Sequence, residues 1–196
     1  MKIFLDVGAH IGETLTVALA DKYGFDKLYC FEPVPECCAV LRNFQDKRVI
    51  VCEYGLWNEN CIMPLYDPQS LGASIFKDKF GNRLVHWKYA QFIRASDWFK
   101  QYLKDDDHVY LKLNCEGAEC GILDDLITSG QYRKIAVAMI DFDVYKIPSQ
   151  KHLASKIKAT LNQLGIPKIF YTDEYHPGKG GHDFFTRSWL NDSMKP

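Results

Sequence analysis

A short glycine-containing segment near the start of the chain is the first place where residue types and spacing suggest chemistry. The segment DVGAHIGE spans residues 6–13 and follows a run of apolar residues. Gly8 permits a tight turn and lets a ligand approach the backbone, and Gly12 lets the start of a helix pack closely. We therefore expect this segment to join a strand to a helix beside a bound ligand.

An acidic residue follows this loop at the distance typical of a ribose-binding carboxylate. Glu32 comes at the end of a second apolar run, roughly 20 residues after Gly8. A carboxylate at this place accepts hydrogen bonds from the hydroxyl groups of a ribose. The loop and the acid together predict a cofactor that contains a nucleoside.

The chemistry of the loop favours S-adenosylmethionine over a dinucleotide. A loop of the form G-x-G-x-x-G places a pyrophosphate at a helix N-terminus, but His10 stands where its middle glycine would be. Asp6 also disfavours a phosphate and favours a cationic group, such as the amino group of an amino acid. S-adenosylmethionine has that amino group and a ribose for Glu32. A nicotinamide-dependent oxidoreductase remains the alternative, because it would share the fold and the ribose-binding acid.

Three carboxylates that follow later apolar runs are candidates for acid–base chemistry. Methyl transfer to a hydroxyl needs a base, and Glu116, Asp141 and Asp143 are placed to supply one. Asp141 and Asp143 alternate along a predicted strand end, so both should point to the same side of the sheet. Each carboxylate also has a structural interpretation: Glu116 precedes Gly117 in a tight turn, and the two aspartates would cap the turn that follows them.

The elements that must position these residues alternate between strand and helix. The predicted strands span residues 2–7, 27–31, 48–52, 108–113, 135–140, 168–171 and 183–187, and helices are predicted after Gly12, from Pro35, and over 96–103, 119–128 and 149–164. This pattern predicts an α/β fold with three layers, in which a seven-stranded, doubly wound, Rossmann-like sheet lies between helices. The last two strands have no helix between them, so the sheet should be mostly parallel with an antiparallel last strand.

One long segment breaks this alternation. We expect residues 1–196 to form a single domain with an irregular insertion at about 55–94, in which CIMPLY (61–66) is one arm of a hairpin. Aromatic residues gather in the insertion: Trp57, Tyr66, Phe76, Phe80, Trp87, Tyr89 and Phe92. They either anchor the insertion on the sheet or form a platform for a ring-bearing acceptor such as a sugar. The few basic residues among them argue against a nucleic-acid partner.

The composition sets further limits on function. Lys and Arg number 24 and Asp and Glu number 25, so a net charge of -1 predicts neither a membrane nor a nucleic-acid partner. The sequence has no apolar run of membrane-spanning length and no signal peptide, which predicts a cytoplasmic protein. Seven cysteines without a CxxC pair predict neither a disulfide framework nor a zinc site.

Three blocks of the sequence resemble the FkbM-type family of S-adenosylmethionine-dependent methyltransferases, which has the class I methyltransferase fold. FLDVGAHIGET (4–14) resembles the family's glycine motif DVGANIG, and FEPVPE (31–36) resembles its ribose-binding FEP motif. LKLNCEGAE (111–119) resembles its KxDxEGxE motif, with Asn114 in place of the aspartate. The blocks come in the family's order, and the resemblance covers about residues 3–145.

The resemblance implies a cofactor pocket built from all three blocks. Its cofactor-binding residues would be Asp6, Gly8, Ala9, His10, Gly12, Glu13, Glu32, Pro33, Tyr54, Gly55 and Asn114. Tyr54 and Gly55 would meet the adenine, and Asn114 would lie near the methionine part and the reacting methyl group. Asn114 lacks the negative charge of the aspartate that the family has at this position. A non-catalytic subunit that binds the cofactor is therefore a further alternative.

A divalent metal is a possibility that this analogy raises but does not favour. Some class I O-methyltransferases, such as catechol O-methyltransferase, hold Mg²⁺ with carboxylates after the fourth and fifth strands, where Glu116, Asp141 and Asp143 stand. The analogy rests on the fold alone, so the metal stays unknown.

The sequence therefore predicts a methyltransferase that uses S-adenosylmethionine to methylate a hydroxyl of a sugar or other small metabolite. Its acceptor would be a small molecule or a glycan. Cover for that acceptor would come from the insertion, from the loop at 178–181, or from a second subunit of a homo-oligomer.

Overall fold

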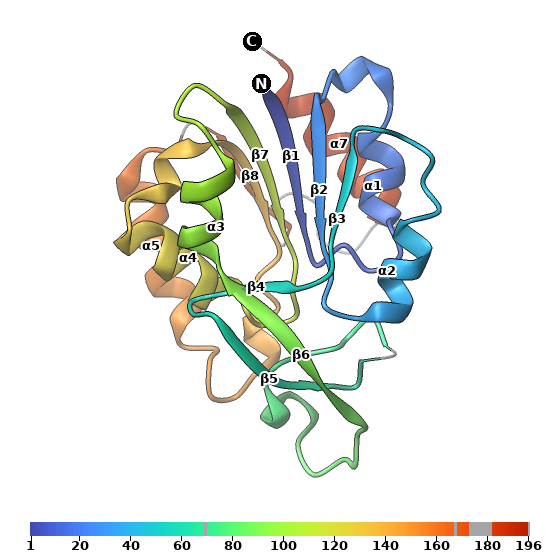
Figure 1. Ribbon diagram of the computed structural model, residues 1–196. Helices are drawn as coiled ribbons and strands as arrows, with labels where there is room; N and C mark the ends of the chain where they lie inside the picture. Colours follow the sequence, from blue (N-terminus) through green and yellow to red (C-terminus); the bar gives the residue numbers. More distant parts are fainter. Residues whose placement is uncertain (69, 167, 173–181, 196) are drawn as a thin grey trace.

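The computed structural model describes the chain except residues 69, 167, 173–181 and 196 (Figure 1). Its centre is a sheet of six described strands in the order β3-β2-β1-β7-β8-β9. These strands are β1 (Lys2–Val7), β2 (Lys27–Phe31), β3 (Val49–Cys52), β7 (His108–Leu113), β8 (Ile135–Ile140) and β9 (Lys168–Tyr171). All neighbouring pairs among them are parallel, and the strand order reverses at β1. The structure confirms the predicted doubly wound α/β fold.

Helices cover both faces of this sheet and complete the three layers (Figure 1). One face carries α1 (Glu13–Ala18), α2 (Pro35–Leu41) and α7 (His182–Ser193), and the other carries α3 (Ala95–Tyr102), α4 (Glu119–Thr128) and α5 (Leu153–Leu164). Short 3₁₀ helices lie in the connections: η1 (Asp21–Tyr23), η3 (Gln131–Lys134) and η4 (Asp143–Lys146). Among the described helices, none has the length and apolar character needed to cross a membrane.

The strands are buried on both sides because each supplies residues to two cores in alternation. Leu5 belongs to the core beneath α3, α4 and α5, whereas its neighbour Phe4 belongs to the core with α1 and α7. In the same way, Leu111 and Tyr110 of β7 enter opposite cores. A strand covered on both faces reads as a continuous apolar run, which is why these strands were predictable from the sequence.

The predicted last strand at 183–187 is wrong, because this segment lies within the helix α7. The described sheet therefore ends at β9, which is parallel to β8, and contains no antiparallel last strand. Thr186, Trp189, Leu190 and Ser193 are buried, and their spacing is that of one helix face. The segment DFFTR has only two adjacent apolar residues, which do not distinguish a strand from a helix, and the helical period is visible only over this longer window.

The insertion forms a second, smaller sheet with the order β4-β6-β5. Its strands are β4 (Gly55–Trp57), β5 (Cys61–Tyr66) and β6 (Trp87–Arg94), and η2 (Lys77–Phe80) lies in the long connection between the last two. β5 is antiparallel to β6, which confirms the predicted hairpin arm, whereas β4 is parallel to it. Figure 1 shows this sheet beyond the C-terminal ends of the central strands, where ligands bind in open α/β folds.

Candidate functional site

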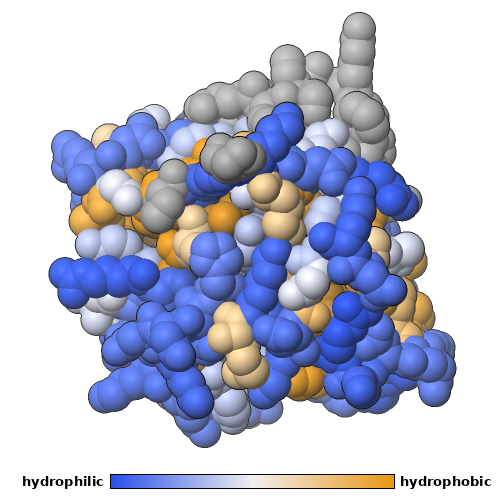
Figure 2. Space-filling model, turned by 90° about the horizontal axis from the view of Figure 1, so that it is seen from above, coloured by the Kyte–Doolittle hydropathy of each residue, from blue (hydrophilic) through white to orange (hydrophobic). Residues whose placement is uncertain are grey.

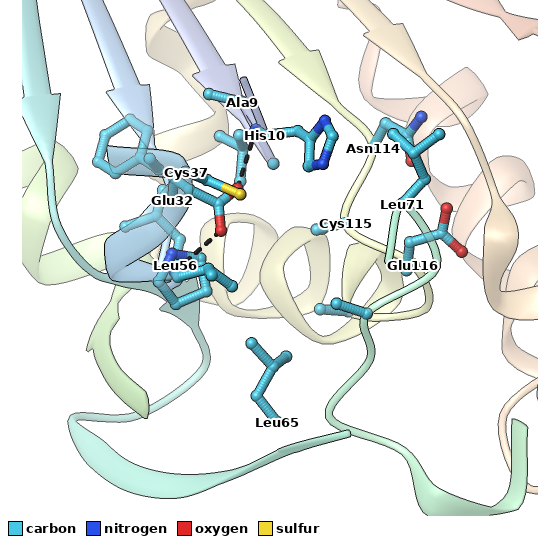
Figure 3. A pocket seen from close by; sticks show the side chains of 18 of the residues that line it. Ala9, His10, Glu32, Cys37, Leu56, Leu65, Leu71, Asn114, Cys115 and Glu116 are labelled. Carbon is cyan, nitrogen blue, oxygen red and sulfur yellow. Dashed lines mark hydrogen bonds between the residues drawn. The ribbon is translucent and has the colours of Figure 1, made fainter. Parts of the chain in front are cut away.

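A pocket lies between the C-terminal ends of the central strands and the insertion (Figure 3). The glycine loop, the end of β2 and the segment after β7 supply its polar wall. The opposite wall comes from the insertion and is apolar, and includes Leu56, Leu65, Ala73, Ile75 and Phe92. The insertion, one of the three predicted sources of cover for an acceptor, therefore forms one wall of the pocket. The second predicted cover, at 178–181, lies outside the described residues.

The backbone of the glycine loop is held against the two strands that flank β1. The amides of Gly8 and Ala9 both donate to the carbonyl of Phe31, each at 3.1 Å. Gly8 has a φ of +81°, and a Cβ there would stand 1.9 Å from the carbonyl oxygen of Asn114. Glycine is thus required by the backbone of β7 as well as by the turn. The close approach predicted for Gly8 is therefore an approach to protein, namely to Asn114.

His10 also has left-handed backbone, with a φ of +48°. Histidine is among the residues that adopt this region more readily than most. The amide of His10 points at Glu32, and its ring Nδ1 lies 2.9 Å from the carboxylate of Glu13. The loop therefore directs one backbone donor and one side chain into the pocket.

Glu32 is buried at the pocket wall, with 6% of its surface exposed. Its two oxygens accept hydrogen bonds from the amides of His10 and Val34, both at 2.9 Å (Figure 3). Burial raises the pKa of this carboxyl, and the two backbone donors oppose that rise. Because each carboxylate oxygen has two lone pairs, Glu32 retains capacity to accept hydrogen bonds from a ligand hydroxyl.

Asp6 lies behind the pocket rather than at its wall. It is fully buried, and its carboxylate is 2.9 Å from the ammonium group of Lys112, its neighbour across β1 and β7. Lys112 lines the pocket and also donates to the carbonyl of Gly8 at 2.7 Å. Asp6 thus acts on the pocket through Lys112, which the site prediction omitted. The signal was available: Lys112 is a lysine inside the apolar run HVYLKL.

Most of the other residues expected to bind the cofactor are at the pocket wall. The predicted residues that line it are Gly8, Ala9, His10, Glu13, Glu32, Pro33, Gly55 and Asn114. Gly12 is instead packed beneath the ring of Phe44, as expected for a close helix start. Tyr54 lies in the core, where its hydroxyl accepts a hydrogen bond from Trp98 at 3.1 Å.

Glu116 stands at the other end of the pocket, in the loop between β7 and α4 (Figure 3). It has a φ of +53°, and its carbonyl accepts a 2.7 Å hydrogen bond from the hydroxyl of Ser74 in the insertion. Its carboxylate forms an ion pair with Lys79, which also donates to the carbonyl of Gly72. Burial and the adjacent carboxyl of Asp143 raise the pKa of Glu116 to about 7, and Lys79 opposes that rise.

Glu119 holds the loop between β7 and α4 through hydrogen bonds to its backbone. It is fully buried, and its carboxylate accepts hydrogen bonds from the amides of Cys115 and Gly117, both at 3.0 Å. Gly117 has a φ of +114°, and a Cβ there would stand 1.8 Å from the side chain of Ile147. The loop that presents Glu116 is therefore held by a buried acceptor and by tight packing.

The strand alternation that predicts one side of the sheet for Asp141 and Asp143 does not apply to them. β8 ends at Ile140 and η4 begins at Asp143, so the two-residue period of a strand does not extend to them. Asp141 accepts hydrogen bonds from Asn114 at 3.3 Å and from Thr172 at 2.7 Å. Asp143 lies 2.6 Å from Lys146 and beside Glu116. Both aspartates contact the pocket through a residue that lines it.

The described residues contain no group of three or more His, Cys, Asp or Glu side chains placed to hold a metal ion. The carboxylates considered for Mg²⁺ have other partners: Lys79 for Glu116, Lys146 for Asp143, and Thr172 for Asp141. This arrangement does not fit a metal site, and we derive no step through a metal.

The charges of the pocket wall are predominantly negative. Glu13 and Glu32 line it, whereas Glu116 is paired with Lys79 and Lys112 is balanced by Asp6. Among the described residues at the pocket wall there is no arginine. The described pocket wall therefore offers no bidentate arginine contact to a phosphate or pyrophosphate.

Comparison with solved structures finds similarity to the methyltransferase FkbM from Methylobacillus flagellatus KT. The TM-score is 0.49 and the identity 18%, over 84% of this chain and 37% of that chain. The chain thus spans well under half the length of that protein. No protein-family model and no curated protein matches the chain. A likeness at this level does not bear on function, so the functional argument rests on the pocket itself.

Proposed function

We propose that this chain is an S-adenosylmethionine-dependent methyltransferase that methylates a hydroxyl of a sugar or other small metabolite. One observation carries the proposal. A buried carboxylate, Glu32, and a strained glycine loop meet in one pocket at the C-terminal edge of the sheet, as the resemblance to the FkbM-type motifs implies.

The charge of the pocket supports this cofactor over a nicotinamide dinucleotide. S-adenosylmethionine carries a sulfonium and an ammonium group against one carboxylate, so it is a net cation. A dinucleotide would bring a pyrophosphate with two negative charges toward Glu13 and Glu32. Like charges at close range disfavour binding, and Lys112 is already neutralised by Asp6.

The pocket residues fit this group in their donors and acceptors. Glu32 would accept the ribose hydroxyls, and Glu13 would face a cationic part of the ligand. The apolar wall formed by Leu56, Leu65 and Phe92 would pack against the adenine. When bound, S-adenosylmethionine would supply an electrophilic methyl group.

Glu116 is the residue we propose as the base for the acceptor hydroxyl. It lines the pocket in strained backbone, and such strain gathers at functional sites. A pKa of about 7 suits a group that takes up a proton near neutral pH. Asp143 and Lys79 would act through Glu116 as positioning residues, and Asp141 would hold the amide of Asn114.

Thermal unfolding with added ligand separates the two cofactor classes, since a ligand that binds the folded state raises the melting temperature. We expect S-adenosylhomocysteine to raise it and NAD to leave it unchanged. Stabilisation by NAD alone would favour the oxidoreductase.

Incubation with methyl-labelled cofactor and a panel of glycans and small hydroxylated metabolites then tests catalysis. Label should pass to an acceptor with the wild type and be lost with Glu116→Gln. Cofactor binding without transfer to any acceptor would favour a non-catalytic subunit.

A further inference from the structure

The connection between η2 and β6 carries large apolar side chains in contact with solvent. Residues 81–89 are all exposed except the half-buried Val85. Leu84 is as exposed as a residue in an extended chain, Tyr89 is 66% exposed and Trp87 is 51% exposed. Figure 1 shows this connection at the end of the molecule farthest from the chain termini. Figure 2 shows the opposite end, where hydrophilic residues predominate and apolar ones form separate spots.

The small sheet extends this apolar character over its outer face. Trp87 and Tyr89 lie on one face of β6, and Ile62, which is 72% exposed, lies on the same face through its pairing with Gln91. Ala90 and Phe92 point to the other face and are buried. A one-layer sheet usually places its polar residues toward solvent, and here Gln91 shares the solvent-facing side with Trp87, Tyr89 and Ile62.

The segment that carries this apolar surface is basic, although the chain as a whole is slightly acidic. Residues 77–89 contain four basic residues and one acidic residue, Asp78, whereas the whole chain has a net charge of -1. Lys77, Arg83 and Lys88 are exposed, and the fourth, Lys79, is turned inward to Glu116. The pairing of Lys88 with Glu36 is between exposed side chains, so it contributes little and opens readily.

We propose that residues 81–89, together with Ile62, form a docking surface for a membrane that contains anionic lipid. Leu84 would enter the acyl region, and Trp87 and Tyr89 would lie at the headgroup level, where amphipathic rings are favoured. Arg83, inside the exposed segment, would meet anionic headgroups, and the exposed Lys77 and Lys88 would add to the positive charge of the region. The nearly balanced charge of the whole chain predicts no membrane partner. We propose one because the positive charge is concentrated in this single segment.

A membrane fits this surface better than a single-stranded nucleic acid. Bases stack on the flat faces of aromatic rings, but Trp87 and Tyr89 meet edge to face at 86°. Leu84 and Ile62 have no such face, and they are the most exposed apolar residues of the surface. Docking would also leave the pocket free, because Phe92 of β6 lines the pocket from the face opposite Tyr89.

Sedimentation of the full chain with lipid vesicles tests the proposal. The wild type should sediment with vesicles of phosphatidylcholine and phosphatidylserine, but not with phosphatidylcholine alone, and less at high salt. Arg83→Ala should weaken association about fivefold, whereas Lys47→Ala, at an exposed lysine of another surface, should not. Leu84→Ser should also weaken it, whereas Val40→Ser, at an exposed residue of α2, should not.

Tryptophan fluorescence provides a second readout that does not depend on a variant's folding. Of the four tryptophans, Trp98 and Trp189 are buried and Trp57 is half-buried, so brominated lipid should quench chiefly Trp87. Absence of wild-type sedimentation and quenching with anionic vesicles would overturn the proposal. Binding of single-stranded RNA through Trp87 without vesicle association would replace it with a nucleic-acid surface.

Discussion

The ammonium group of Lys112 lies 2.9 Å from the carboxylate of Asp6, and both residues are almost completely buried beneath the glycine loop. The same ammonium donates to the carbonyl of Gly8 at 2.7 Å. This buried pair therefore connects the first and third motif blocks and fixes the loop that faces the pocket. A buried charge that loses its partner is strongly destabilising, which makes the pair testable.

Replacing Lys112 by methionine should lower the free energy of unfolding by about 3–5 kcal/mol, because Asp6 is left as a buried, unpaired charge. Denaturant unfolding measures this loss. The double variant Asp6→Leu/Lys112→Met removes both charges, so it should be more stable than Lys112→Met alone. If the single and the double variant have the same free energy of unfolding, the loss in Lys112→Met does not come from the unpaired charge of Asp6.

Gly8→Ala should destabilise the fold more than Gly24→Ala does. Both glycines have positive φ, which costs an alanine about 1–2 kcal/mol. A Cβ at Gly24 meets nothing within 4 Å, whereas a Cβ at Gly8 meets the carbonyl oxygen of Asn114 at 1.9 Å. The difference between the two variants in the free energy of unfolding, measured in urea, gives the cost of this steric contact. Equal losses of stability in the two variants would contradict the prediction.

The rate of methyl transfer should rise with pH through about 7 if Glu116 is the base, because its carboxylate must be ionised to accept a proton. Lys79 lowers the pKa of Glu116, so Lys79→Met should move this rise to higher pH. Lys77→Met, at an exposed neighbour, serves as the control. Glu116→Gln should lower kcat about 100-fold or more. If the rate of methyl transfer by Lys79→Met rises over the same pH range as that of the wild type, Glu116 is not the titrating base.

Glu119 should make stability depend on pH. Burial raises the pKa of this carboxyl from 4.5 to about 7, so the folded state favours its protonated form. The resulting contribution to the free energy of unfolding is fully present below pH 4.5 and is lost as the pH rises through about 7. Glu119→Gln removes this titration, and its stability should vary less with pH than that of the wild type. Glu53→Gln, at an exposed site, should keep the wild-type dependence.

The parts of the site predicted from the sequence are those specified by short-range spacing. Gly8, His10 and Glu32 follow directly from strand ends, and a parallel sheet brings such ends together at one edge. The role of Lys112 depends on its register with Asp6 across two strands that are distant in sequence, and no local pattern indicates that register.

The misplaced elements have similarly specific causes. The strand predicted over 135–140 has the bounds of β8, but its alternation does not continue through Asp141 and Asp143, because η4 begins at Asp143. The segment DFFTR (183–187) predicts a strand because the buried residues that reveal the helical period of α7, such as Trp189 and Leu190, lie beyond it. The apolar wall of the pocket comes from the irregular insertion, which has no period from which to predict an inward face.

Calorimetric titration with S-adenosylmethionine tests the central claim most directly, using the wild type, Glu32→Ala and Glu53→Ala. Glu53 is an exposed acid just after β3, so its replacement controls for the loss of a charge. The wild type and Glu53→Ala should bind with similar affinity. Glu32→Ala should bind at least about tenfold more weakly, because hydrogen bonds to a charged group contribute about 1.5–3 kcal/mol each. If properly folded wild-type protein does not bind, or if Glu32→Ala binds as tightly as Glu53→Ala, the pocket is not the S-adenosylmethionine site that we propose.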